Sequence, residues 1–187
     1  MTKLPIVESY WVEEDRFLAG EYPGSFNPGE ARRKIDAFLE SGIRTFIDLT
    51  QPGELVPYEP VLKEEARLYD CMTVYHRFGI QDGSIPSVQT MSIILDAIDS
   101  ALQSGSPVYV HCWGGVGRTG TVVGCHFIRH GMSAQDALER LDALYKTRPK
   151  DPYLRTSPET PEQFDFVRKW RELPGSDHRS KQRFCEG

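Results

Sequence analysis

The stretch PVYVHCWGGVGRTG, residues 107–120, decides how the middle of this chain folds. It opens with a short apolar run, which is typical of a buried central β-strand. Glycines at 114, 115 and 117 follow, and they allow tight backbone turns that other residues resist. A helix is predicted from about Arg118 to His130, and Gly131 ends it. The stretch therefore predicts a strand, a glycine-rich loop and a helix, in that order.

This order of elements creates a site for an anion. Successive backbone N–H groups in such a loop point into one concavity, and the start of the helix adds partial positive charge. Arg118 lies in the first helical turn and can direct its guanidinium fork at the same anion. Cys112 lies at the other end of the loop, where those amides stabilise a thiolate. A thiolate beneath a bound phosphate is an in-line nucleophile, so we expect Cys112 to attack phosphorus.

Two other phosphate-binding patterns fit the loop less well. Residues 115–120 also match G-x-G-x-x-G, but a dinucleotide site needs a second strand after the helix, ending near an acidic residue. Here another helical pattern follows, with Glu139 in its middle. No lysine precedes Thr119, which argues against a Walker A loop. A glycine turn with an idle cysteine stays open as the alternative without function, although it leaves the pairing of Cys112 with Arg118 unexplained.

Working outward, strand and helix patterns alternate along the chain. Strands are predicted at 16–19, 44–49 and 72–78, and helices at 28–41, 61–69, 87–105, 133–146 and around 164–170. Such alternation predicts a single α/β domain with a mostly parallel central sheet flanked by helices. Ligands of these sheets bind beyond the carboxyl ends of the strands, where the strand ending at Cys112 delivers its loop. We expect residues 1–172 to form the domain and residues 173–187 to be a polar, flexible tail.

The overall charge argues against two classes of partner. The chain has 187 residues and a formal net charge of −5 at pH 7. This acidity disfavours broad electrostatic binding to nucleic acid or to an anionic membrane surface. No apolar run is long enough to span a bilayer, and the first residues lack a signal-peptide core. We therefore expect a cytoplasmic protein that binds neither nucleic acid nor membrane. No feature of the sequence indicates an oligomeric state.

The four cysteines, at 71, 112, 125 and 185, do not form a C-x-x-C pair. This spacing predicts no zinc site, and we expect no metal or other cofactor. Cys71 and Cys125 read as small buried apolar residues, and Cys185 lies in the polar tail. Cys112 differs from them because of its neighbours in the glycine-rich loop.

Residues His111 to Gly120 match the pattern H-C-x-x-G-x-x-R-[ST]-G at every position. The match resembles the signature of the cysteine-based protein tyrosine and dual-specificity phosphatases. The glycine-rich version is similar to the branch of kinase-associated and Cdc14-like phosphatases. The resemblance covers about residues 10–172 and implies a dual-specificity-phosphatase-like fold that works without a cofactor.

The resemblance also implies roles for the residues of the loop. Cys112 would form a phosphocysteine intermediate, while Arg118 and the loop amides hold the phosphate oxygens. Thr119 would help the sulfur to leave, and His111 would order the loop and tune the thiol. The substrate-binding segment consists of Trp113, Gly114, Gly115, Val116, Gly117 and Arg118.

A leaving alkoxide or phenoxide needs a proton, and the family carries an aspartate about 30 residues before the cysteine. Asp82 has this position, between glycines that permit loop motion. Asp48, at the end of a predicted strand, is the alternative acid. Gln163 resembles the late glutamine that positions water in some tyrosine phosphatases, and a surface role at a helix start is equally compatible. Arg155 is a weaker candidate for a substrate contact.

The residues between Cys112 and Arg118 include no lysine or arginine. Extra phosphates on a substrate need countercharge, so the loop favours a singly phosphorylated protein, on tyrosine and also on serine or threonine. Two alternatives remain open at this point. One is a phosphatase for a small phosphorylated molecule or an RNA 5′ end. The other is a phosphate-binding protein without activity.

Overall fold

The computed structural model describes residues 3–149 and 156–172. One sheet lies at its centre, with strand order β1-β2-β5-β3-β4. The strands β2, β5, β3 and β4 run parallel, and β1 pairs with β2 in antiparallel fashion. The predicted mostly parallel sheet is therefore confirmed. The strands are β1 (Ser9–Glu13), β2 (Phe17–Gly20), β3 (Thr45–Asp48), β4 (Val74–Arg77) and β5 (Val108–His111).

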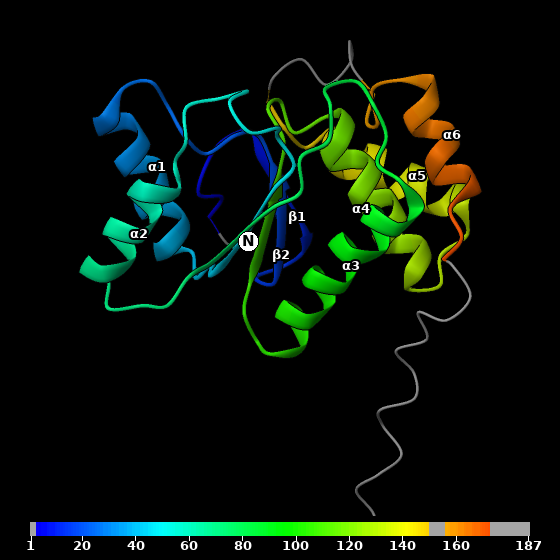
Figure 1. Cartoon of the computed structure of the whole chain (residues 1–187). Helices are drawn as coiled ribbons and strands as arrows, with labels where there is room; N and C mark the ends of the chain where they lie inside the picture. The colour runs from blue at the N-terminus through cyan, green and yellow to red at the C-terminus, as the bar shows by residue number, and fades with distance from the viewer. Residues whose placement is uncertain (1–2, 150–155, 173–187) are drawn as a thin grey trace, which may run out of the picture.

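Helices cover both faces of this sheet (Figure 1). Helices α1 and α2 lie on one side, and α3 to α6 lie on the other. The result is a single α/β domain of three layers, as the alternating pattern predicted. The helices are α1 (Pro28–Glu40), α2 (Glu59–Leu68), α3 (Val88–Gln103), α4 (Gly117–Arg129), α5 (Ala134–Tyr145) and α6 (Pro161–Lys169).

The central strand β5 is buried on both faces. Val108 and Val110 pack into the hydrophobic cluster under α3 to α6, while Tyr109 packs into the cluster under α1 and α2. Side chains of a strand alternate between faces, so a strand with helices on both sides needs apolar residues at every position. This explains why residues 107–112 read as one continuous apolar run, and it places Cys112 at the carboxyl end of the innermost strand.

Strand β1 was not predicted from the sequence. Its pairing with β2 has an irregular register between Trp11 and Glu13, and its burial alternates only in part. None of its five residues is exposed, but its apolar part, Tyr10 to Val12, is too short to identify a buried strand by itself. Glu13, the last residue of the strand, contacts His126, and Glu8, which directly precedes the strand, contacts Arg148.

Two helices begin at a serine whose side chain caps them. Ser87 accepts a hydrogen bond from the backbone of Thr90, and Ser133 accepts one from Asp136. These hydroxyls satisfy amides that have no partner inside the helix. Gly131 has a φ of 97°, a conformation that glycine adopts without strain, and it ends α4 as predicted.

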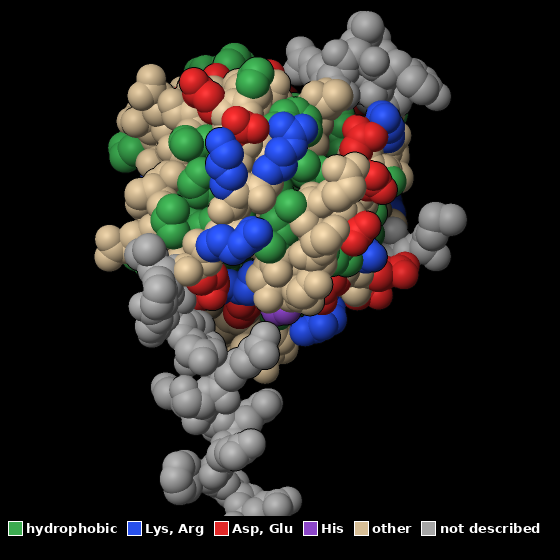
Figure 2. All heavy atoms as spheres, turned by 90° about the vertical axis from the view of Figure 1, so that its right-hand side faces the viewer, with side chains coloured by type: hydrophobic (Ala, Val, Ile, Leu, Met, Phe, Trp, Pro, Cys, Tyr) green, Lys and Arg blue, Asp and Glu red, His purple; other side chains and the backbone are tan. Residues whose placement is uncertain are grey.

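Two of the predictions fall partly or wholly outside the described residues. Arg155 and the tail at 173–187 lie there, so the division at residue 172 stays a prediction. No helix in the described ranges has the length and apolar character that crossing a membrane requires. Figure 2 shows the right-hand side of Figure 1, and on this face acidic and basic side chains are interspersed. The cytoplasmic location also stays a prediction.

Candidate active site

The predicted loop lies between β5 and α4, at the carboxyl end of the sheet. Cys112 is buried, and it contributes to the wall of a cavity of about 390 Å³. Asp82 lines the same cavity from the loop between β4 and α3. Two residues 30 positions apart in the sequence therefore meet in one space, as the spacing predicted. The full lining is Glu21, Asp82, Cys112, Trp113, Gly114, Val116, Gly117 and Glu159.

Gly115 lets this loop pack against the end of β2. Its φ is +66°, in the region that disfavours side chains. A Cβ atom at this position would lie 2.3 Å from the backbone carbon of Gly20, which is far inside contact distance. The glycine is thus required twice, by its own conformation and by the close approach of β2.

Arg118 is held from outside the loop by Glu54. The two carboxylate oxygens of Glu54 accept hydrogen bonds from Nη1 and Nη2 of Arg118 at 2.8 and 2.7 Å. Nη1 also donates to the carbonyl of Ile80. The Nε atom of Arg118 is buried and has no hydrogen-bond partner among the described residues. The fork is therefore oriented in advance, and one donor remains available for an anion.

Sequence reasoning missed Glu54. Burial would raise the pKa of this carboxyl, but hydrogen bonds from Arg118 and from the backbone of Gln51 hold it below its ordinary value. A signal was present, because the turn 51–54 follows β3 and must lie at the same edge of the sheet as Cys112. A single glutamate in a turn nevertheless does not indicate which arginine it will contact.

The structure brings Asp82 into direct contact with Arg118. An oxygen of Asp82 lies 2.8 Å from Nη2 of Arg118, and 63% of the Asp82 side chain is exposed. Solvent access allows a carboxyl to exchange its proton between reaction steps. Two contacts tie the Asp82 loop to α6: Gln163 donates to the carbonyl of Ser84, and the hydroxyl of Thr160 lies 3.4 Å from the carbonyl of Gly83.

Asp48, the alternative acid, is occupied by structural contacts. It is fully buried and accepts hydrogen bonds from Thr50, Tyr75 and Arg77. Burial raises the pKa of its carboxyl, but nearby His111 and these hydrogen bonds lower it below the ordinary value overall. Such a carboxylate is a poor proton donor, so Asp82 remains the candidate acid.

His111 and Thr119 flank the nucleophile in different ways. The ring of His111 is buried between the hydroxyl of Tyr58, at 2.7 Å, and the carbonyl of Cys112, at 3.1 Å. Burial lowers the pKa of His111, and the contact of its ring with the carbonyl of Cys112 ties it to the backbone of the loop. The hydroxyl of Thr119 is buried without a hydrogen-bond partner among the described residues. That hydroxyl is available to a sulfur atom or a bound anion.

Gln163 is buried, unlike a surface residue at a helix start. Its Oε1 accepts from the amides of Glu159 and Thr160, which caps α6, and its Nε2 donates to Ser84. A Cβ atom on Gly117 would lie 2.8 Å from Gln163, so the amide touches the loop that binds phosphate. Its existing hydrogen bonds fix the Asp82 loop against α6, and the predicted contact with water stays a prediction.

A second missed group supports the phosphate-binding loop from below. Arg148 is 5% exposed and donates to the carbonyls of Gly114 and Gly115 at 3.1–3.2 Å. Its charge is balanced by Glu8, whose Oε2 lies 2.8 Å from Nη2. The C=O and N–H groups of a trans peptide unit point in opposite directions. Because these carbonyls point toward Arg148, the N–H groups of the same peptide units point away from it. The sequence did not predict this pair because 140 residues separate its members.

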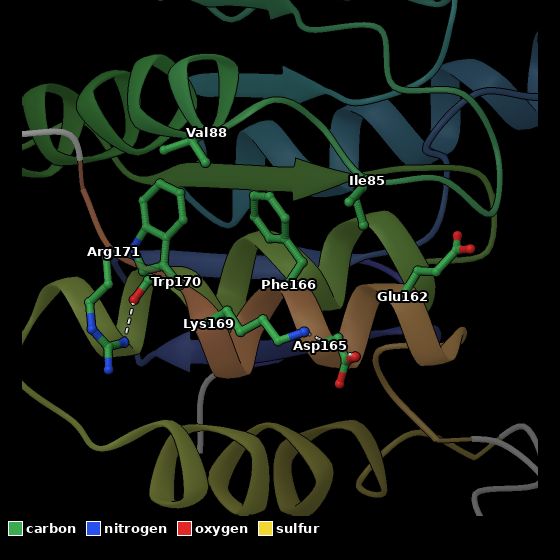
Figure 3. A pocket seen from close by; sticks show the side chains of 8 residues that line it. All are labelled: Ile85, Val88, Glu162, Asp165, Phe166, Lys169, Trp170 and Arg171. Atoms are coloured by element: carbon green, nitrogen blue, oxygen red, sulfur yellow. Dashed lines mark hydrogen bonds and ion pairs between the residues drawn. The ribbon is translucent and has the colours of Figure 1, made fainter.

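Trp113 lies at the rim of the cavity. Its side chain is 60% exposed and lines two adjoining cavities, which favours the mouth over packing beneath the loop. A separate cavity of about 310 Å³ lies between the start of α3 and α6 (Figure 3). There the rings of Phe166 and Trp170 point toward Val88. Its lining includes none of the predicted site residues, so we assign the site to the cavity at Cys112.

Comparison with known proteins bears on these assignments. Residues 23–132 match a family model described as "Polymorphic toxin system, DSP-PTPase phosphatase". Mouse protein tyrosine phosphatase domain-containing protein 1 is 33% identical over 129 residues, which is 65% of this chain and 17% of the relative. Mouse dual specificity protein phosphatase CDC14B is 28% identical over 132 residues, which is 64% of this chain and 24% of the relative.

Two further similarities extend over more of the chain. An Arabidopsis relative, phosphatidylinositol 3,4,5-trisphosphate 3-phosphatase and protein-tyrosine-phosphatase PTEN1, is 27% identical over 164 residues, covering 85% of this chain and 36% of the relative. A crystal structure of kinase associated phosphatase has a TM-score of 0.65 at 18% identity, with 86% and 90% of the two chains covered. The curated relatives are thus much longer than this chain. The family match and the fold agree with the resemblance seen in residues 111–120, and the chain belongs to the DSP-PTPase family of cysteine-based phosphatases.

Proposed function

We propose that this protein hydrolyses phosphomonoesters on proteins through a phosphocysteine intermediate at Cys112. The observation that carries the proposal is the arrangement of one cavity. Cys112 and Asp82 line it together, and Asp82 contacts Arg118, whose Nε has no other partner among the described residues. A nucleophile, an acid and an anion clamp thus meet at one place.

In the first step the Cys112 thiolate attacks phosphorus. A sulfur–phosphorus bond forms while the bond from phosphorus to the substrate oxygen breaks, and Asp82 gives its proton to the departing oxygen. Nε of Arg118 and the amides of the loop hold the three remaining phosphate oxygens. These donors stabilise the negative charge that the oxygens carry in the transition state. Because Glu54 fixes the guanidinium beforehand, little reorganisation is needed as the reaction proceeds.

In the second step water attacks the phosphocysteine. The Asp82 carboxylate accepts a proton from that water, and the sulfur leaves as a thiolate. The buried hydroxyl of Thr119 can donate a hydrogen bond to the departing sulfur. The products are inorganic phosphate and the free enzyme, with Asp82 protonated for the next cycle. Neither step requires a metal or another cofactor.

The charge of the cavity supports a substrate with a single phosphate. Its described lining contains the carboxylates of Glu21, Asp82 and Glu159 and no lysine or arginine. A polyphosphorylated inositide would place extra negative charge beside these groups without countercharge. A phosphorylated residue next to basic residues fits such a mouth better. The Arabidopsis relative is named for both a phosphoinositide and a protein tyrosine substrate, so the experiment must separate the two classes.

We would measure phosphate release by the wild type and by Cys112→Ser from four substrates of equal concentration. These are a phosphotyrosine peptide, a phosphothreonine peptide, vesicles containing phosphatidylinositol 3,4,5-trisphosphate, and an RNA with a 5′ phosphate. We expect turnover of at least one peptide, and a loss of roughly 10³-fold or more in the variant. Faster release from the vesicles or the RNA would overturn the protein assignment. An inert wild type that still binds phosphate would overturn the enzyme assignment.

A further inference from the structure

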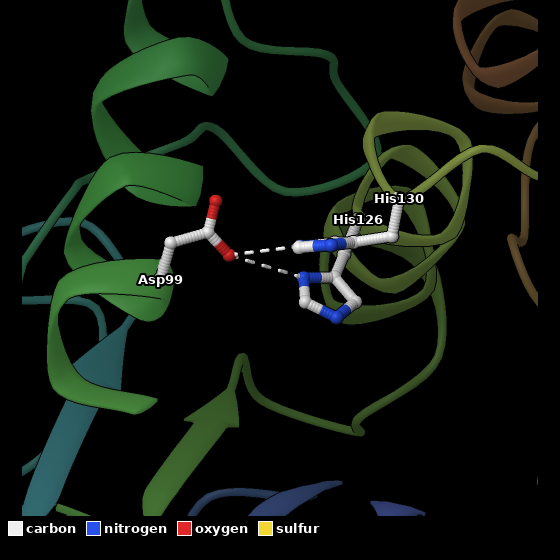
Figure 4. A group of neighbouring side chains, drawn as sticks. All are labelled: Asp99, His126 and His130. Atoms are coloured by element: carbon white, nitrogen blue, oxygen red, sulfur yellow. Dashed lines mark hydrogen bonds and ion pairs between the residues drawn. The ribbon is translucent and has the colours of Figure 1, made fainter. Parts of the chain in front are cut away.

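A group of three potential metal ligands lies at the end of α4 that faces away from the Cys112 cavity. His126 lies in the last turn of α4, His130 follows one turn later as the residue that caps this helix, and Asp99 faces both from α3 (Figure 4). Nε2 of His130 lies 3.0 Å from Oδ1 of Asp99, and Nδ1 of His126 lies 3.8 Å from the same oxygen. All three ligand atoms lie within 4.8 Å of one another.

The ring of His126 is oriented in the way that metal-binding histidines are. It is 2% exposed, and its Nε2 lies 3.3 Å from a carboxylate oxygen of Glu13 on β1. A proton on Nε2 donates to Glu13, so the lone pair of Nδ1 points at Asp99. That Nδ1 is buried and has no hydrogen-bond partner among the described residues. An outer carboxylate that fixes the tautomer of a ligating histidine is a recurrent feature of zinc sites.

The spacing of the three atoms suits a small divalent ion. Zinc bonds of about 2.0–2.2 Å in tetrahedral geometry place neighbouring ligand atoms roughly 3.3–3.5 Å apart. The distances of 3.0 and 3.8 Å to Asp99 lie on either side of this value. Two imidazoles and one carboxylate favour first-row transition ions, Zn²⁺ among them. His130 is half exposed, so an ion can enter from solvent and keep water as its fourth ligand.

The surrounding charges also favour a cation here. The carboxyl end of a helix carries partial negative charge, and Glu13 and Asp99 add two carboxylates. Arg129 opposes them, but it binds the other oxygen of Asp99, with Nη1 lying 3.1 Å from Oδ2. Oδ1 is thereby turned toward the histidines. Arg129 is itself balanced by Asp96 and Glu172.

We propose that Asp99, His126 and His130 form a binding site for a divalent transition metal ion such as Zn²⁺, with Glu13 as the outer partner of His126. The ion would link α3 to α4 and, through Glu13, to β1. Along α4 the site lies roughly 12–18 Å from Arg118, at 1.5 Å per residue, so its role is to stabilise the fold and not to take part in turnover. The cysteine spacing could not indicate this site, because its ligands are histidines and a carboxylate.

The test uses the full chain without an affinity tag and carrying Cys112→Ser, because an active-site thiolate would itself bind zinc. Zn²⁺ is titrated into this protein by calorimetry, and we expect one site. Adding His130→Gln should weaken that site by roughly 10²-fold or more, while Glu13→Gln should weaken it by about 10–100-fold. His76→Gln removes a histidine outside the group and should leave the affinity unchanged.

A second readout identifies the ligands. Co²⁺ bound by two imidazoles and a carboxylate shows visible ligand-field bands without a sulfur charge-transfer band in the near ultraviolet. Circular dichroism checks that each variant is folded, and the exposure of His130 makes its replacement a mild one. Absence of zinc binding, equal affinity in His130→Gln, or a sulfur band that accompanies the binding would each overturn the proposal.

Discussion

The two ends of helix α4 offer opposite electrostatic environments to ligands. At its start, the loop lines the cavity in which we propose that phosphate binds, and Arg118 lies in the first turn of the helix. At its end, His126 and His130 face Asp99 in an arrangement suited to a cation. This division follows the helix dipole, which is positive at the amino end and negative at the carboxyl end. One element thus lies between the site that we propose for phosphate chemistry and the site that we propose for a metal ion.

The two ends also differ in how firmly they are built. The start of α4 is fixed by buried contacts: Arg148 holds the loop carbonyls, Glu54 holds Arg118, and the hydroxyl of Ser157 donates to the carbonyl of Val116. The far end is partly open, since His130 is 54% exposed. Buried polar groups are costly to leave unpaired, whereas exposed pairs are screened by water. We therefore expect larger effects from changes at the start of α4.

The largest effect expected from this comparison is on the chemical step. Asp82→Asn removes the proton donor, and we expect kcat to fall by about 10²–10⁴-fold for phosphoserine or phosphothreonine peptides. The decrease in kcat should be smaller for p-nitrophenyl phosphate, because p-nitrophenolate is a stable anion that can leave without being protonated. Steady-state rates on both substrates give the comparison. Asp70→Asn, at an exposed turn, serves as the matched control, and equal losses on the two substrates would contradict a role as acid.

Next in size is the support beneath the loop. Arg148→Met leaves Glu8 buried without its cation, and we expect the free energy of unfolding to fall by about 3–5 kcal/mol. Without Arg148 the carbonyls of the loop lose their hydrogen bonds and the loop is held less firmly. We therefore also expect kcat to fall by on the order of 10–100-fold. Urea titration and rate measurements at a temperature where the variant is folded provide both values. Glu8→Gln keeps the bonds from Arg148 to Gly114 and Gly115, so it should lose stability with a smaller loss of rate. Equal rate losses in both variants would contradict a direct role for Arg148.

The smallest effect concerns the other end of α4 in the absence of metal. The hydrogen bond that the His130 ring donates to the Asp99 carboxylate raises the pKa of His130 above its ordinary value. The pair of His130 and Asp99 therefore stabilises the folded protein fully below the pKa of histidine in the unfolded chain, about 6.5. This stabilisation is lost as the pH rises through the pKa of His130 in the folded protein. In the presence of a chelator, His130→Gln should lower the free energy of unfolding by less than about 1 kcal/mol at about pH 5.5, because the pair is half exposed.

The same variant should match the wild type at about pH 9, and its phosphatase activity should change little because the residue is far from Cys112. Chemical unfolding at the two pH values tests the first statement. A larger loss at the higher pH would show that the interaction has the opposite sign.

Local information in the sequence was sufficient for most of the fold and for the centre of the site. Residues 107–120 specify a strand, a turn and a helix through side-chain preferences that act over a few residues, and their order fixes where Cys112 and Arg118 lie. Asp82 was found through the family resemblance, because it lies 30 residues before Cys112, where the family carries its aspartate. The edge strand β1 escaped prediction because its five residues show neither a regular alternation nor a long apolar run.

Contacts between distant segments were decided only by the tertiary structure. Glu54 and Arg118 are 64 positions apart, and Glu8 and Arg148 are 140 positions apart. A charged side chain has the same local preferences whether it meets water or a buried partner, so no short pattern reveals the pairing. The sequence determined which residues we propose for the chemistry, because the proposed nucleophile and anion clamp lie on one continuous loop. The packing of the sheet and helices decided which carboxylates pair with Arg118 and Arg148. The same packing brought Asp99 close to His126 and His130.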